Sequence, residues 1–502
     1  MTSYSPAVTS YSALERQVSY HASLRRAAVR QAVTRTLVVV GALLAGAGAG
    51  LLPLEAVALG IVIVLAIAVW RTPALGAYLV MGLTPLTTGI DRGTLIPVLR
   101  PNEALLALVG GVLFARWLFG LRALNGGRVQ VDTVLGSILA LALTSSVVPL
   151  VWLALRNEPI TSDDLLYTLV IWKYLGVFLL VRSAVRTAAE IRWCLLVSIG
   201  AAVLVAIVAV LQSRGVGVVI NALSHYYVTN GNVDALSDSR GSSTLTLPIA
   251  VADLMVFNLA IIVGMWLYAR MRPVLVVGAA CMIVAGTLAA AEFSGVLGLA
   301  VGVLVLLVVT QSGRLSKITL PGLMLAVLGL WPVIHVRLLG FQSTSGLPVS
   351  WTGRLFNLRN YFWPVLREGN NYLLGVRPAA RIPAPHRANG FIWIESGYTW
   401  LLWAGGIPLL LAFIFFVVSC WRVAWSAARH ATGSQRVAGL ATVTALAVMT
   451  VLMSFDPHLT YRGSADALFA LIALTVISPH PAPPNVPPSL RPPRPEVIHV
   501  HV

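Results

Sequence analysis

The sequence has 502 residues, of which 58% are hydrophobic and 11% are charged, and its formal net charge is +17. Soluble domains carry about 25% charged residues, whereas apolar stretches long enough to cross a bilayer recur along this whole chain. The composition therefore excludes an ordinary soluble protein and predicts an integral membrane protein.

The basic balance has a simple explanation in a membrane protein. An excess of Lys and Arg often indicates nucleic acid or anionic lipid as a partner, but cytoplasmic loops carry the same excess because it fixes orientation. We therefore expect membrane lipids and no nucleic acid as partners. The three cysteines (Cys194, Cys281, Cys420) stand singly in apolar stretches, which predicts packing residues, no metal site and no cofactor.

Apolar stretches follow a basic tail over residues 1–36, and they predict an all-α, polytopic bundle of about 14 transmembrane spans. The expected spans are 37–53, 54–70, 74–91, 103–120, 131–154, 165–183, 193–212, 247–268, 273–290, 293–311, 318–338, 397–421, 437–454 and 462–478. Thus membrane helices are expected over 37–338 and again over 397–478. The region 285–300 gives the weakest boundaries.

The distribution of arginine predicts the orientation of these spans. With both termini cytoplasmic in a multi-pass plasma-membrane protein, most Lys and Arg fall in cytoplasmic segments, as such segments require. Two long polar loops then lie on the outer face, near 213–246 and over 339–396. The proline-rich tail over 479–502 cannot remain helical for long, and we interpret it as disordered and cytoplasmic.

The loop over 339–396 carries positive charge that topology does not explain. Between Thr352 and Glu395 it holds one other acid, Glu368, and six arginines: Arg354, Arg359, Arg367, Arg377, Arg381 and Arg387. Guanidinium groups bind phosphate oxygens in bidentate fashion and stay charged at any relevant pH. The loop either binds an anionic ligand or is a solvated segment that contacts lipid headgroups.

Within this loop, Gly353 to Trp363 reads as a short amphipathic helix, and Leu374-Gly375-Val376 reads as the turn that follows it. Such a helix would lie along the membrane surface. That depth is where the pyrophosphate of a lipid-linked sugar would sit.

These patterns, over roughly 280–420, resemble the O-antigen ligase/polymerase family. The resemblance implies a metal-independent glycosyltransferase that moves glycan from a polyprenyl-pyrophosphate carrier to an acceptor hydroxyl on the outer face. Arg354 matches the arginine that opens the loop helix, and Leu374-Gly375-Val376 matches its closing turn. Arg377 stands where a second glycine is usual. At the spacing where ligases hold histidine, this chain has Glu395-Ser396 followed by Gly406. Glu292-Phe293-Ser294-Gly295 lacks the arginine that the family often has there. These departures favour a polymerase over a ligase.

The reaction needs a cationic group for the departing pyrophosphate and a base for the acceptor hydroxyl. We expect Glu395 to be the base, with His386 as its rival. Alternatively, Glu395 pairs with Arg387 or caps a helix. The expected pyrophosphate- and substrate-binding residues are Arg337, Arg354, Arg359, Arg377, Arg381, Arg387 and Tyr398.

Other polar residues are weaker candidates. Asp456 and His458, with Arg462, either face the same cavity or are ordinary loop residues, and the same alternative holds for Arg92 and Arg100. Two more residues lie in or near apolar spans: Glu292, and Lys173, which either snorkels or pairs with an acid such as Asp253.

Two other functions remain open. One is a flippase or transporter of lipid-linked sugars or another anion. The other is a non-enzymatic factor that acts with other polysaccharide-assembly proteins.

Overall fold

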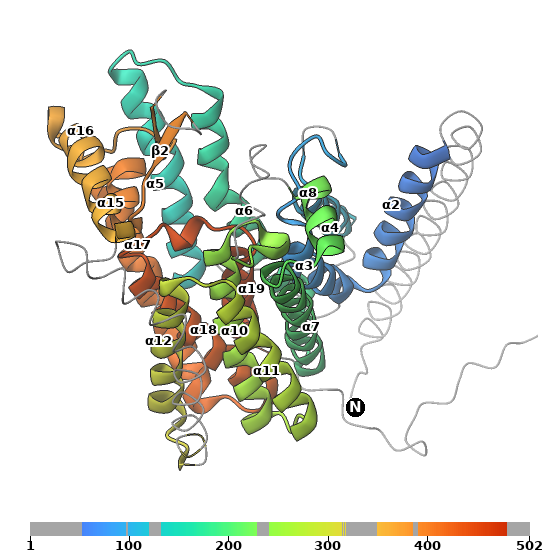
Figure 1. The fold of residues 1–502 in the computed structure, drawn as a ribbon. Helices are drawn as coiled ribbons and strands as arrows, with labels where there is room; N and C mark the ends of the chain where they lie inside the picture. The colour runs from blue at the N-terminus through green and yellow to red at the C-terminus, as the bar shows by residue number, and fades with distance from the viewer. Residues whose placement is uncertain are drawn as a thin grey trace, which may run out of the picture. The chain divides into compact units, whose positions relative to one another are not determined.

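The computed structural model describes residues 53–96, 99–119, 132–227, 240–313, 315, 317, 349–384 and 390–478. The chain divides after Arg71 into two units. The described part of the first unit is α2 (Pro53–Arg71), an apolar helix. All further description concerns the second unit (Figure 1).

Helices make up most of the described residues of this unit, as the sequence predicts. In chain order they are α3 (Pro73–Thr87), α4 (Pro101–Leu118), α5 (Thr133–Leu155), α6 (Ser162–Ala184), α7 (Ala188–Ser213), α8 (Gly217–Tyr226), α10 (Pro248–Tyr268), α11 (Pro273–Ala289), α12 (Phe293–Thr310), α15 (Val349–Asn357), α16 (Trp363–Arg367), α17 (Gly397–His430), α18 (Gly433–Leu452) and α19 (Ser464–Val476). A π-helical turn, Leu358–Phe362, joins α15 to α16. In the described residues the strands β1 (Arg381–Pro383) and β2 (Phe391–Trp393) form one antiparallel pair.

The membrane prediction is confirmed in its coarse form. Seven described helices, α5, α6, α7, α10, α12, α17 and α18, are long and apolar enough to cross a membrane. Helices α3, α11 and α19 are apolar but shorter, as is the part of α2 from Val57 to Arg71. The count of about 14 spans is not confirmed. Residues 318–338 and all but the last residue of 37–53 lie outside the described residues, as do both expected tails.

Helix starts follow local rules. Proline occupies the first turn of α3, α4, α10 and α11. A backbone N–H in the first turn has no acceptor within the helix, so the N–H that proline lacks is not missed there. Capping boxes built on Thr161 and Asp164, and on Thr187 and Glu190, begin α6 and α7. Part of the loop expected near 213–246 is helical, because Gly217–Tyr226 forms α8.

The core lies where α18 packs against α10, α12 and α17. Glycines on one side of α12 allow a close approach. A Cβ added to Gly302 would lie 2.8 Å from Val256 of α10, and one added to Gly298 would lie 3.2 Å from Leu452 of α18. Lipid supplies no hydrophobic driving force between helices, so the close van der Waals packing that small residues allow holds the helices together.

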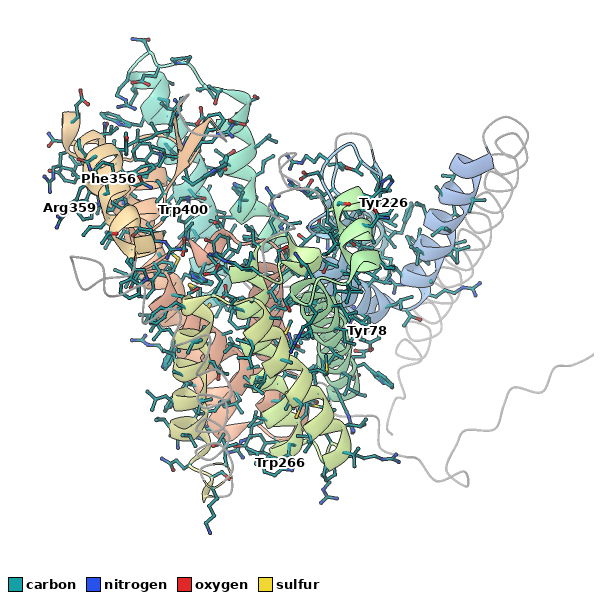
Figure 2. The ribbon with its side chains drawn as sticks, viewed as in Figure 1. Tyr78, Tyr226, Trp266, Phe356, Arg359 and Trp400 are labelled. Atoms are coloured by element: carbon teal, nitrogen blue, oxygen red, sulfur yellow. The ribbon has the colours of Figure 1, made fainter. Side chains whose placement is uncertain are left out.

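The loops with most of the charge gather at one end of these helices, which we call the polar end. Its described residues are 89–96, 99–103, 156–164, 240–247, 290–292, 349–384, 390–396 and 453–463. Backbone contacts join them, such as Gly89 N–H to Thr244 O at 3.0 Å and Gly397 N–H to Met453 O at 2.8 Å. In Figure 1 helices α15 and α16 and strand β2 mark this end, and Trp266 marks the opposite end of α10 in Figure 2.

Candidate functional site

The segment from α15 to α16 lies on the polar end with one apolar side inward. Phe362 is buried and its ring meets that of Trp403 in α17, with centroids 5.2 Å apart. Phe356 and Arg359 are exposed on the outward side, where Figure 2 labels them. The structure therefore agrees with the amphipathic helix expected over Gly353–Trp363, with a π turn added.

The expected turn, Leu374–Val376, packs directly against the backbone of the glycine pair of α17, Gly405 and Gly406. The Val376 N–H donates to Trp403 O at 2.7 Å, and the Ile407 N–H donates to Tyr372 O at 3.0 Å. Gly406 has φ of 66°, and a Cβ there would lie 2.4 Å from Leu373 O. Only glycine allows this approach without strain, so these residues hold the loop against the start of α17.

Arg354 lies between two acids from different parts of the chain. Its Nη1 is 3.1 Å from Asp456 Oδ2, and its Nε is 4.0 Å from Glu395 Oε1. Glu395 precedes α17 and is half-buried, and Asp456 follows α18 and is buried. Asn357, one turn beyond Arg354 on α15, donates from Nδ2 to Glu395 Oε2 at 3.4 Å.

Asp456 is the most perturbed acid outside the helices. Burial raises the pKa of its carboxyl from 3.8 to about 6, although Arg354 and His458 act to lower it. Glu395 and Glu292 add to the rise. A carboxyl in a site of this kind exchanges its proton near neutral pH, which is where acid–base catalysts operate.

A buried His–Asp pair lies beside this cluster. The Nδ1 atom of His458 is 2.7 Å from Asp253 Oδ2, and both side chains are almost wholly buried. Lys173 does pair with an acid, as one of the two expectations had it, but the acid is Asp466 of α19 rather than Asp253: Lys173 Nζ lies 2.9 Å from Asp466 Oδ1. The positions of α6, α10 and α19 decide these partners.

Two other arginines of the loop, Arg377 and Arg381, have structural partners. Arg377 donates from Nε and Nη2 to Asp164, at 3.2 and 3.0 Å, and Asp164 is fully buried. Arg381 pairs with Asp163 and lies over the ring of Phe391 at 3.9 Å. These contacts tie the loop to the start of α6 rather than to the Arg354 cluster.

The remaining candidates are scattered. The hydroxyl of Tyr398 donates to Thr450 O at 2.8 Å, and Arg359 is exposed. Arg92 and Arg100 pair with Glu103 and Asp91. His386, Arg387 and Arg337 lie outside the described residues.

Glu292 also has a partner. It is 3.0 Å from Arg240 Nη1 and lies immediately before α12, so the expected helix boundaries near 285–300 are close to those observed. Arg462 is exposed at the polar end.

The pair formed by Asp253 and His458 was not predicted from the sequence. One signal was available, because an acid within an apolar span needs a partner and marks a candidate site. The chain separation of 205 residues hides which partner it finds. Within the described ranges, no group of three or more His, Cys, Asp or Glu residues is arranged to hold a metal ion. Comparison with protein-family models, curated proteins and solved structures finds no match.

Proposed function

We propose that this protein is a membrane-embedded glycosyltransferase that moves glycan from a polyprenyl-pyrophosphate carrier to an acceptor hydroxyl, and that it polymerises cell-surface polysaccharide repeat units rather than ligating finished chains. The observation that carries the proposal is Arg354, which a surface helix holds beside Asp456 and Glu395 at the polar end.

The chemistry of transfer matches this group of residues. Breaking the anomeric C–O bond leaves negative charge on the pyrophosphate, and a preorganised guanidinium stabilises that charge. Arg354 is 22% exposed and so is accessible to a lipid-linked anion. Glu395 is 36% exposed and can accept a proton from a hydroxyl. Arg377 and Arg381 have the separate task of anchoring the loop.

The same proposal sets the location of the site. In a plasma-membrane protein with both termini cytoplasmic, the polar end faces away from the cytoplasm. The arginines there oppose the usual charge bias of outer loops, which supports a binding role. Donor lipids reach this level from the bilayer, and acceptor glycans reach it from outside.

Replacing Arg354 with alanine tests the proposal. We expect the R354A variant to lose long glycan chains and to accumulate a single repeat unit on the carrier, because its transition state lacks the main cation. The matched control is R367A, which removes an exposed arginine at the end of α16. Carrier-linked glycans are extracted from membranes and sized by electrophoresis.

Each other outcome identifies a different function. Normal chain lengths with stably expressed R354A would refute the catalytic role of Arg354. Single repeat units trapped on the cytoplasmic leaflet would indicate a flippase. Full-length polymer retained on the carrier would indicate a ligase.

A further inference from the structure

Three buried polar atoms around the Arg354 cluster and the Asp253–His458 pair lack hydrogen-bond partners among the described residues. They are His458 Nε2, Asp253 Oδ1 and Asn357 Oδ1. The Oδ2 atom of the buried Asp456 is held by the ion pair with Arg354. His458 and Asp253 are each 2% exposed, and Asp456 is 4% exposed. Buried polar groups are usually paired, because an unpaired one loses its hydration without compensation. Asp253 contacts His458, and His458 and Asp456 are two residues apart with a backbone hydrogen bond of 2.8 Å between them, so one small region is left able to receive hydrogen-bond donors.

The Asp253–His458 contact determines what the imidazole offers. When its Nδ1–H donates to Asp253 Oδ2, across 2.7 Å, the neutral ring presents Nε2 as an acceptor. All three unpartnered atoms are then acceptors. A neutral hydroxyl group, as on a sugar, is the donor that suits such a set.

The charge of this region disfavours an anion at the same position. This region holds more acidic side chains than arginines paired with them. The acids are Asp253, Asp456, Glu395 and Glu292, and the arginines are Arg354 and Arg240. Phosphate would be repelled by the carboxylates, whereas a polyol would satisfy them. Arg354 therefore stands at the boundary between a pyrophosphate position and a hydroxyl position.

We propose that Asp253, His458 and Asp456 form the subsite for hydroxyl groups of the acceptor sugar, and that His458 Nε2, rather than Glu395, takes the proton of the attacking hydroxyl. This inference rests on the proposed function. The acceptor O–H bond breaks and its proton goes to Nε2, while the oxygen forms a bond to the anomeric carbon of the donor. The bond from that carbon to the pyrophosphate oxygen breaks, and its electron pair leaves with the pyrophosphate beside Arg354. Asp253 is a positioning residue that holds the ring and stabilises the imidazolium.

Arg354 also controls access to this subsite. Its side chain is 22% exposed and that of Asp456 is 6% exposed, with 3.1 Å between Nη1 and Oδ2. When the guanidinium turns toward a pyrophosphate, Asp456 becomes available to the acceptor. The donor is therefore expected to bind before the acceptor.

Variants of His458 test the inference in two assays. The first measures glycan transfer in proteoliposomes with carrier-linked glycan from the host cells. The second measures equilibrium binding of the same glycan, released from its carrier and radiolabelled, in the presence of the carrier pyrophosphate. The H458N variant keeps an amide that can donate to Asp253 but lacks Nε2. We expect it to bind glycan about two- to tenfold more weakly and to transfer it at least about a hundredfold more slowly.

Two further variants separate the roles. H458Q places an amide near the Nε2 position, so it is expected to recover binding but not transfer. H430N makes the same change at an exposed histidine at the end of α17 and is expected to behave as wild type. Melting curves identify variants that have not folded.

The outcomes distinguish this inference from the function on which it rests. If wild type extends glycans and H458N does so equally well, the subsite is refuted and the glycosyltransferase stands. If wild type neither extends nor binds glycan, both are refuted. If wild type binds glycan without extending it, the transferase and its proton-transfer step are refuted.

Discussion

The raised pKa of Asp456 makes a quantitative prediction for the D456N variant. Burial raises the carboxyl pKa from 3.8 to about 6, a shift of about two units, and each unit corresponds to about 1.4 kcal/mol. Ionising Asp456 in the folded protein therefore costs about 3 kcal/mol more than ionising it in the unfolded chain. D456N has no such cost.

The sign follows from which state holds the proton. Well below pH 3.8 the carboxyl is protonated in both states, and the stability linked to its raised pKa is fully present. As pH rises from about 3 through about 6, the unfolded chain ionises first, so that stability is lost. Relative to D456N, wild type should lose about 2.5 kcal/mol of unfolding free energy between pH 4 and pH 7.

Two measurements check this result. Reversible unfolding in mixed micelles gives the free energies at each pH. Infrared difference spectra follow the C=O band of the protonated carboxyl, which should titrate near pH 6 and be absent from D456N. In R354A the midpoint should move above 6, because Arg354 is the largest of the groups that lower this pKa. A midpoint near 4, or a band that persists in D456N, would refute the reasoning.

Three other substitutions test the contacts that shape the polar end, with unfolding free energy as the measurement. G406A should destabilise by at least about 2 kcal/mol, because a Cβ there meets backbone, whereas G353A, in open space, should cost nothing; equal effects would contradict the close packing. K173M should cost about 3 to 5 kcal/mol by leaving Asp466 unpaired, and the double variant K173M/D466L should regain most of it. R377A should cost about 2 kcal/mol or more and loosen the loop from α6, so unchanged stability would argue against the anchor.

The helices could be predicted because lipid leaves the backbone no alternative. Each expected span within the described residues coincides with a helix, although the ends differ. The span expected over 397–421 is a helix that runs on to His430. Arg429 and His430 in its last turn favour the longer helix, because cations interact well with a helix C-terminus. Hydropathy alone ends the span where the apolar residues end.

Partners across the bundle could not be predicted in the same way. Lys173 and Asp466 are 293 residues apart, and Asp253 and His458 are 205 apart. A buried charge requires a partner, but sequence does not show which helices are neighbours. The role of Arg377 was hidden for the same reason, since its partner Asp164 lies 213 residues away in the chain.

These ion pairs change the interpretation of the arginine-rich loop expected over 339–396. Its surplus of arginine suggested one anion site, yet Arg377 and Arg381 hold their charges against Asp164 and Asp163. Arg354 differs because its principal partner, Asp456, has a raised pKa and can take up a proton. In the proposed reaction, a pyrophosphate that draws Arg354 away removes the main group favouring ionised Asp456, so anion binding and proton uptake become linked. The guanidinium of Arg354 then links binding of the donor pyrophosphate to the protonation of Asp456, which lies beside His458. The number of arginines in the loop does not reveal this link.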